Sequence, residues 1–379
     1  MKKLFNLLLI TLLLSFTSCS EPEPIAPENK PEVEDKATDD DKDDLNDDNS
    51  DDDDNNDNDD NNNDDDNDND DQVIVEGSVV ATYGDLKVKG NKITDKNGNA
   101  IQLRGMSLFW SQWMGQFYTS GTVKWLKDDW KATIVRAAMG VEDNGGYLTN
   151  KEREKNKVFT VIDAAIAQGI YVIVDWHSHH AEDHTNEAIA FFSEVAEKYG
   201  DTPNIIYETY NEPLNVSWTG VLKPYHEKVI EAIRKHDPDN LIICGTRTWS
   251  QRVDEVVNNK IDDPNVAYTL HYYSSTHRQN LRNYAQTALN NNIPIFVTEY
   301  GVSEASGNGT IDVNEAKVWW KFLDDNKISW CNWSVADKVE ASAALKPGAS
   351  GNGGWTESQL TQSGKMIRDE MRAKNQDFK

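Results

Sequence analysis

The chain has 379 residues, of which 65 are acidic and 38 basic, giving a net charge of −27 at pH 7. A charge of this sign argues against nucleic acid as a partner, because phosphate binding needs a positive surface. Most of the charge lies in residues 21–71, which hold 26 acidic and three basic residues, so the remainder of the chain is only mildly acidic.

The N-terminus predicts export. Two lysines precede an apolar run from Leu4 to Phe16 that is too short to span a bilayer, so residues 1–18 are expected to be a signal peptide. The small residues before Cys19 resemble a bacterial lipoprotein signal, in which that cysteine becomes the acylated N-terminus. We therefore expect an outer-membrane or cell-surface lipoprotein that meets the membrane only through its lipid. Ordinary cleavage and full secretion is the alternative.

Residues 19–75 predict a linker. A Pro/Glu stretch and an Asp/Asn tract contain almost no apolar side chains, so this segment cannot bury enough surface to offset its ordering entropy. It is expected to be a disordered, self-repelling tether. A calcium site is disfavoured, because the tract lacks the turn glycine and terminal Glu of an EF-hand loop.

Residues 76–379 predict one α/β domain. Short alternating runs broken by Asn-Gly pairs, from Leu86 to Leu103, indicate a β-hairpin that leads into the first strand. Eight apolar, β-branched runs follow, separated by segments of helical periodicity such as residues 158–166 and 190–199. The predicted strand cores are Ile101–Met106, Ile134–Met139, Ile170–Asp175, Ile205–Tyr210, Leu241–Gly245, Val266–His271, Ile295–Glu299 and Ile328–Trp333.

So regular a repeat favours a (β/α)8 TIM barrel over an open doubly wound sheet. Cys244 and Cys331 lie within apolar strand-like runs, and we expect both to remain reduced in the core.

Polar and aromatic residues interrupt the apolar runs at the C-terminal strand ends, where such a barrel carries its active site. They include Arg136, His177, Asn211, Glu212, His271, Tyr273, Glu299 and Trp333. Glu212 and Glu299 follow different strands, and they can face each other across the shared rim. Two opposed carboxylates are the minimum machinery for hydrolysing a glycosidic bond.

Retaining hydrolysis needs one protonated and one ionised carboxyl group. Arg136 and Tyr273 are expected to lower the pKa of Glu299 and so keep this nucleophile anionic. The neighbouring charge and partial burial are expected to raise the pKa of Glu212, which suits a general acid. Asn211 can offer its amide to the sugar 2-hydroxyl.

All 12 tryptophans follow the tether. Flat aromatic faces stack against pyranose rings, so a tryptophan-rich rim favours a carbohydrate ligand. For Trp113, Trp218 and Trp333 individually, packing in the core is the alternative.

The chain resembles glycoside hydrolase family 5, and within it the bacterial endo-β-1,4-glucanase (cellulase) branch, over roughly residues 83–375. The motifs that carry the resemblance, in the family's order and spacing, are Leu103–Ser107, Val135–Met139, Val174–His177, Tyr207–Pro213, Leu270–Tyr273, Val297–Gly301, Trp333-Ser334, Asp337-Lys338, Glu340 and Ser342–Leu345.

This resemblance implies that Glu212 is the acid/base and Glu299 the nucleophile of a retaining enzyme that cuts internal β-1,4-glucosidic bonds. It implies a supporting polar shell of Arg136, His177, Asn211, His271 and Tyr273, and sugar-binding roles for Trp113, Trp218, Trp333, Lys338 and Glu340. The expected partner is a β-glucan polysaccharide, and we expect a monomer that needs no metal or other cofactor.

Two positions depart from the cellulase branch: Phe109 stands where His is common, and Gly140 where Tyr is common. Both shape the non-reducing side, so mixed-linkage glucan, xyloglucan or mannan remain alternatives to cellulose as substrate.

Two further readings compete. One is a metal-dependent hydrolase on the same fold, whose ligands would be His177, His179, His180, His271 and Asp337. It is disfavoured because the fifth strand offers no His or Lys. The other is a surface glycan-binding lipoprotein that has lost catalysis, which the intact carboxylates and supporting groups argue against.

Overall fold

The computed structural model describes residues 74–376 and 378. The predicted signal peptide, Cys19 and residues 19–73 of the predicted linker lie outside the described residues.

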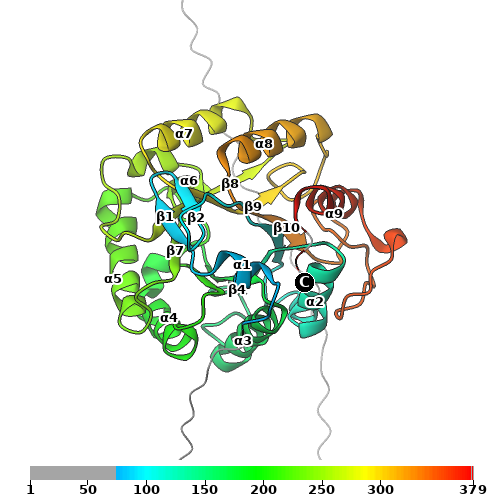
Figure 1. The fold of residues 1–379 in the computed structure, drawn as a ribbon, viewed down its shortest axis with the longest axis horizontal. Helices are drawn as coiled ribbons and strands as arrows, with labels where there is room; N and C mark the ends of the chain where they lie inside the picture. The colour runs from blue at the N-terminus through cyan, green and yellow to red at the C-terminus, as the bar shows by residue number, and fades with distance from the viewer. Residues whose placement is uncertain (1–73, 377, 379) are drawn as a thin grey trace, which may run out of the picture. The chain divides into compact units, whose positions relative to one another are not determined.

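Eight parallel strands close into a barrel in the order β10-β3-β4-β5-β6-β7-β8-β9, ringed by helices (Figure 1). The strands are β3 (Arg104–Leu108), β4 (Ile134–Gly140), β5 (Tyr171–His177), β6 (Ile205–Glu208), β7 (Leu241–Cys244), β8 (Val266–Tyr273), β9 (Ile295–Gly301) and β10 (Trp330–Val335). Every residue of these strands is buried. Burial on both faces explains why their sequences are nearly continuous apolar runs. The predicted (β/α)8 barrel is confirmed.

The helices that follow the strands carry ordinary end signals. Gly169 ends α3 with a φ of 64°, a left-handed conformation that glycine adopts without steric cost, and Asp312 caps the N-terminus of α8. The helices of the ring are α2 (Ser120–Asp128), α3 (Lys151–Gln168), α4 (Thr185–Tyr199), α5 (Lys223–Arg234), α6 (Arg247–Ser250), α7 (Gln279–Asn290), α8 (Val313–Asn326) and α9 (Gln362–Lys374).

One connection departs from a regular βα unit. Between β7 and β8, α6 is a single four-residue turn in which Thr248 and Trp249 have positive φ angles of 60° and 52°. These angles do not fit a continuing helix. Backbone bonds from Thr248 to Leu214 and from Trp249 to Pro213 hold this turn against the loop after β6.

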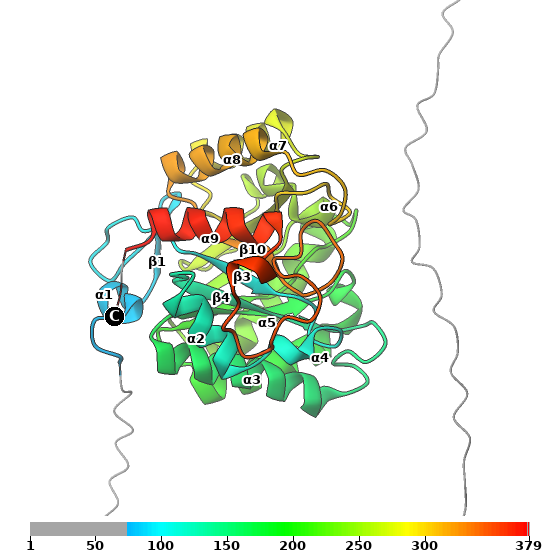
Figure 2. The same cartoon turned by 90° about the vertical axis from the view of Figure 1, so that its right-hand side faces the viewer.

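A short hairpin closes the N-terminal end of the barrel. Strands β1 (Lys87–Lys89) and β2 (Lys92–Thr94) pair antiparallel, which confirms the predicted hairpin, and α1 (Val79–Tyr83) precedes them. Asn265, just before β8, binds the hairpin segment at both Leu86 and Val88. Figure 2 shows α1 and β1 at one end of the barrel and α6 at the other.

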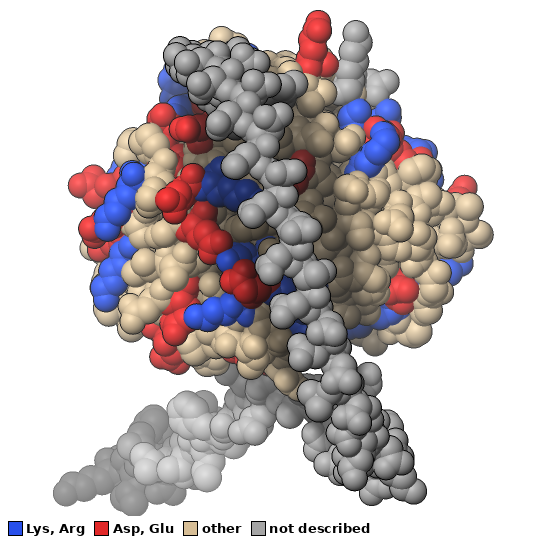
Figure 3. Space-filling model, turned by 90° about the horizontal axis from the view of Figure 1, so that it is seen from below, with Lys and Arg blue, Asp and Glu red and all other residues tan. Residues whose placement is uncertain are grey.

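The two core cysteines, Cys244 in β7 and Cys331 in β10, are buried free thiols, as predicted. In the part of the chain that the structure describes, no helix combines the length and apolarity needed to cross a bilayer. On the face seen in Figure 3, acidic and basic side chains are interspersed, in agreement with the small net charge counted for this part of the sequence.

Candidate active site

Glu212 and Glu299 meet at the C-terminal end of the barrel. Glu299 lies within β9, and Glu212 lies in the loop after β6. Both line a groove of about 510 Å³, together with His179, Thr248, Trp249, Gln251, His271, Tyr273, His277 and Ala305. One oxygen of each carboxylate and a ring nitrogen of His271 lie within 4.8 Å of one another. This separation is close to the roughly 5 to 5.5 Å of retaining sites and well below the roughly 6.5 to 9.5 Å of inverting ones.

Strand register brings these groups together. A shift in the pairing of β8 with β9 sets His271 directly opposite Glu299. Arg136 in β4 donates from Nη1 to Glu299 Oε2 at 3.1 Å, and the Tyr273 hydroxyl donates to Glu299 Oε1 at 2.7 Å. The predicted neighbours of Glu299 are therefore confirmed.

Arg136 and Tyr273 each lower the pKa of Glu299, as predicted, but the net direction expected for this carboxyl group is wrong. Burial raises the pKa of this carboxyl group, and the charge of Glu212 raises it further. Stabilisation of the anion by His271, Arg136 and Tyr273 does not outweigh those two effects.

The pKa expected for Glu212 is also wrong in direction. Burial works to raise it, but His179 Nε2 lies 3.2 Å from Oε2 and His271 Nδ1 lies 2.9 Å from Oε1. Each histidine binds a different carboxylate oxygen, and together they lower the pKa of Glu212 to about 2. From the sequence, His179 was considered only as a ligand of the disfavoured metal site, and its contact with Glu212 was not predicted.

The proton that an acid catalyst needs is held next to Glu212 in the free protein. Burial lowers the pKa of His271, but the carboxylates of Glu208, 3.7 Å from Nε2, and of Glu212 outweigh it and raise this pKa to about 9. Near neutral pH the Glu212–His271 pair therefore holds one proton, located on the imidazole. A shift of that proton along the 2.9 Å contact protonates Glu212.

Arg136 is the centre of the buried polar network. Its guanidinium contacts Glu208 at 2.7 Å and Asp175 at 2.8 Å, besides Glu299, and these carboxylates raise its pKa against the effect of burial. Asn211 Oδ1 accepts a further bond at 2.7 Å. Because the amide oxygen is occupied, the amide NH₂ of Asn211 is the donor available to a sugar hydroxyl. Asp175 and Glu208 were not predicted as site residues, since they lie inside apolar strand sequences.

The imidazole of His177 is held between a carboxylate and two tryptophan rings. Its Nδ1 lies 2.7 Å from Asp175, and burial lowers its pKa well below the usual range, so the ring is neutral. The indole of Trp333 lies parallel to it, with ring centres 5.2 Å apart and planes 3° apart. Trp110 packs edge-on against the same imidazole.

An aromatic cluster continues from Trp333 at the C-terminal end of the barrel. Phe109 lies between Trp333 and Trp113, with ring centres 5.1 and 6.4 Å away. Trp113 is 50% exposed, so its ring can stack on a ligand. The Lys338 ammonium lies 4.5 Å from the Phe109 ring centre and 2.6 Å from Glu340.

The space beside Gly140 is filled by the side chain of Gln112. A Cβ at this position would lie 1.8 Å from the side-chain oxygen of Gln112, so the Gln112 amide occupies the space that a larger side chain would need. Both polar atoms of that amide are buried without a hydrogen-bond partner among the described residues.

Trp218 does not reach the groove, contrary to the expected sugar-binding role. It is 4% exposed, packs against His226 and Tyr268, and donates its indole N–H to Asn259. Trp249 lines the groove instead and is 44% exposed. The sequence signal for Trp249 was weak, because α6 gives no strand or helix periodicity.

The histidine cluster of the disfavoured metal-dependent alternative is not assembled as a group of metal ligands. Asp337 binds Gln116 and the backbone of Gly348, and His177 binds Asp175. Within residues 74–376 and 378, Glu212, His271 and Glu299 are the one group spaced to hold an ion. Their polar atoms are already engaged with one another and with Arg136 and Tyr273.

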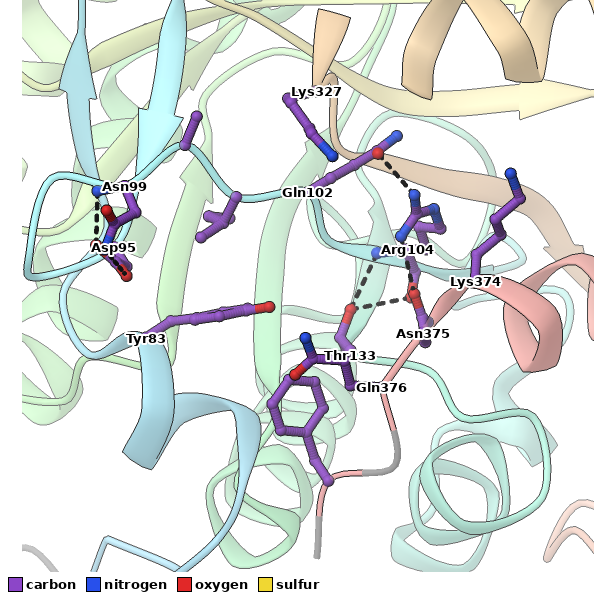
Figure 4. A pocket seen from close by; sticks show the side chains of 13 residues that line it. Tyr83, Asp95, Asn99, Gln102, Arg104, Thr133, Lys327, Lys374, Asn375 and Gln376 are labelled. Atoms are coloured by element: carbon purple, nitrogen blue, oxygen red, sulfur yellow. Dashed lines mark hydrogen bonds between the residues drawn. The ribbon is translucent and has the colours of Figure 1, made fainter. Parts of the chain in front are cut away.

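A second cavity, of about 350 Å³, lies at the hairpin end of the barrel, beside Arg104, Thr133 and Tyr83 (Figure 4). Of its lining residues that the structure describes, Asp95 is the one acid, and Asn99 binds its carboxylate. This cavity offers no pair of facing carboxylates, so the chemistry belongs to the groove at the other end.

A parallel barrel with two facing carboxylates and a row of aromatic rings at its C-terminal end is the architecture of glycoside hydrolases. Comparison with known proteins agrees: residues 94–339 match the model of the family described as Cellulase (glycosyl hydrolase family 5). The chain belongs to this family.

The chain is similar to Endoglucanase Z of Dickeya dadantii, with 51% identity over 291 residues that cover 76% of this chain and 66% of that protein. It covers 61% of a second relative, Endoglucanase A of Evansella cellulosilytica, at 46% identity. The chain thus spans less than two thirds of the length of these curated relatives.

Solved structures give the same picture. One from Cytophaga hutchinsonii is 57% identical, with a TM-score of 0.78 over 79% of this chain and 97% of that one. The catalytic domain of Thermobifida fusca endoglucanase Cel5A, solved in complex with cellotetraose, is 35% identical, with a TM-score of 0.74 over 77% of this chain and 99% of that one.

Proposed function

We propose that this chain is an endo-β-1,4-glucanase that hydrolyses internal bonds of cellulose or a related β-glucan with net retention of anomeric configuration. The observation that carries the proposal is the 4.8 Å limit on the separation of the Glu212 and Glu299 oxygens. The names of the relatives, endoglucanases in both cases, and the cellotetraose bound to the Thermobifida protein support a β-glucan substrate.

In the first step, Glu299 attacks the anomeric carbon and forms a glycosyl ester, while Glu212 gives its proton to the departing glycosidic oxygen. In the second step, Glu212 takes a proton from water, and the resulting hydroxide cleaves the ester and releases Glu299. Tyr273 and Arg136 hold Glu299 in position for attack. Asn211 offers its amide to the 2-hydroxyl as the oxocarbenium-like transition state forms.

The aromatic residues suggest where the two ends of a glucan chain bind. We assign Trp333, Trp113, Lys338 and Glu340 to the non-reducing side, and Trp249 rather than Trp218 to the leaving-group side. Trp249 stands beside Glu212 because its backbone is bonded to Pro213, the next residue after the acid/base.

The pH dependence follows from the two shifted groups. We expect kcat/KM to rise with pH as Glu299 loses its proton, at a pKa above the ordinary glutamate value, because only the anion attacks. It should fall again with an apparent pKa near 9, when the Glu212–His271 pair loses its single proton. Rates on a soluble oligosaccharide across the pH range measure both limbs. An alkaline limb already complete at neutral pH would contradict the assignment.

Trp249→Ala is expected to raise KM for long oligosaccharides roughly 2- to 10-fold, because ring stacking contributes about 0.5–1.5 kcal/mol. Turnover of cellobiosyl fluoride, whose leaving group carries no ring to stack on Trp249, should stay unchanged. Trp218→Ala is the matched control: it should lower the free energy of unfolding by about 3–5 kcal/mol without the KM change. An unchanged KM in Trp249→Ala would remove this residue from the leaving-group side.

The direct test is a panel of cellulose, mixed-linkage glucan, xyloglucan and mannan with product sizing. Cellulose or mixed-linkage glucan should give a ladder of oligosaccharides, with the β anomer formed first by NMR. An initial α anomer would reject retention. Binding without new reducing ends would favour the non-catalytic lipoprotein, and activity that is lost on chelation and restored by zinc would favour the metal-dependent hydrolase.

We further propose that the chain is exported, with residues 1–18 as signal peptide, Cys19 as lipid attachment site, residues 19–75 as tether and 76–379 as catalytic domain. Palmitate labelling at Cys19 and sensitivity of processing to globomycin test the anchor. A soluble, unlabelled protein would show ordinary secretion instead.

A further inference from the structure

A buried chain of hydrogen bonds connects Glu208 to the proposed acid/base Glu212 through Thr298 and His271. Thr298, next to Glu299 in β9, donates its hydroxyl to Glu208 Oε1 at 2.6 Å. His271 Nε2 lies 2.8 Å from the same Thr298 oxygen. Thr298 and Glu208 are 0% exposed and His271 is 2% exposed, so water does not supply alternative partners.

The direction of each bond can be assigned. Glu208 is anionic because Arg136, against the effect of burial, lowers its pKa, and an ionised carboxylate only accepts. The one hydroxyl hydrogen of Thr298 is therefore committed to Glu208. The two lone pairs of its oxygen remain for His271 and for Thr269, whose hydroxyl also contacts it. His271 Nε2 must then carry a hydrogen.

This assignment decides what the other ring nitrogen can do. With Nε2–H fixed, a neutral His271 presents the bare Nδ1 to Glu212 and accepts its proton. A protonated His271 presents Nδ1–H to the Glu212 anion. The opposite neutral tautomer would donate from Nδ1 at all times and hold Glu212 ionised, which is useless for an acid.

We propose that Thr298 is a positioning residue that fixes the Nε2–H tautomer of His271 and thereby lets Glu212 and His271 share one proton. The inference rests on the proposed function only in taking Glu212 as the acid/base. The titratable and charged groups around His271 and its partner are Glu208, Glu212, Glu299, Asp175, Arg136, His177, His179, Tyr273 and His277.

The first test is ¹⁵N NMR of the mature wild-type chain, with His271→Gln used to assign the His271 signals among the eight histidines. Above its pKa of about 9, the ring should show a protonated Nε2 and a bare Nδ1. A neutral ring protonated at Nδ1 would overturn the proposal, and this readout does not depend on catalysis.

The second test compares Thr298→Val, which keeps the shape but lacks the hydroxyl, with the conservative Thr298→Ser. In Thr298→Val, kcat/KM on cello-oligosaccharides should fall about 10-fold or more, as part of the ~10²–10⁴ supplied by a general acid, and its alkaline limb should move to lower pH. Formation of the glycosyl ester from a 2,4-dinitrophenyl cellobioside should be unaffected, because that leaving group needs no proton.

Thr298→Ser should restore both the rate and the pH profile. Equal losses on both substrates with an unmoved alkaline limb would show a purely structural role and reject the proposal. A wild-type chain that is inactive on every glycan but shows the Nε2–H tautomer would overturn the proposed function and support the Thr298 assignment.

Discussion

Glu299→Gln is expected to reduce kcat on cello-oligosaccharides by roughly 10⁴- to 10⁶-fold, the scale of loss seen when a covalent nucleophile is removed. The amide keeps the size of the side chain but cannot form the glycosyl ester. The barrel should remain folded, because Arg136 keeps two other carboxylate partners, Glu208 and Asp175. The variant also loses a negative charge 4.8 Å or less from Glu212.

Steady-state rates of the variant measure the loss of activity, and thermal unfolding shows separately whether the barrel remains folded. Glu304→Gln is a suitable control, since Glu304 is an exposed acid in the loop that follows β9 and contacts neither catalytic carboxylate. It should keep wild-type activity. Wild-type-like rates in Glu299→Gln would reject Glu299 as nucleophile.

Glu212→Gln is expected to show a loss that depends on the leaving group. On cello-oligosaccharides, kcat/KM should fall by about 10²–10⁴, because the sugar oxygen leaves only after protonation. On 2,4-dinitrophenyl cellobioside the first step should be nearly unchanged. The second step still lacks its base, so the glycosyl ester should accumulate.

Rapid-mixing measurements should therefore show a burst of dinitrophenolate followed by slow turnover in this variant. His180→Ala is a matched control in the loop that also carries His179, and it should behave like the wild type. Equal losses with both substrates and no burst would contradict an acid/base role for Glu212.

Sequence reasoning predicted the barrel because its strands are buried on both faces and read as continuous apolar runs. It also predicted Glu212, Glu299, Arg136 and Tyr273 as neighbours, because parallel strands of a barrel share one C-terminal rim. The contacts found between them agree with that expectation.

The pKa directions could not be predicted, because they depend on distances rather than on neighbourhood. Of the two histidines that lower the pKa of Glu212, His179 lies in the loop after β5 and His271 lies in β8, where the register shift between β8 and β9 sets its position. The extent of burial of Glu299 could not be read from the sequence either, and burial together with the charge of Glu212 outweighs the lowering of its pKa by Arg136 and Tyr273.

The exposure of individual side chains also could not be predicted from the sequence. Trp218 and Trp249 both follow strand ends in the sequence, yet one is buried beneath α5 residues and the other lines the groove. The positive φ angles at Thr248 and Trp249 turn the chain there, and the sequence of this segment has no periodicity that would predict the turn. Similarly, the glycine at position 140 is explained only by the structure, in which the Gln112 side chain fills the space beside it.

Chemical trapping tests the central claim most directly. A 2-deoxy-2-fluoro cellobioside with a dinitrophenyl leaving group should form a long-lived ester, because the fluorine slows both formation and hydrolysis of the ester while the good leaving group speeds formation alone. Peptide mapping by mass spectrometry should locate the added disaccharide on Glu299. A label on Glu212, or turnover with inversion and no ester at all, would contradict the account.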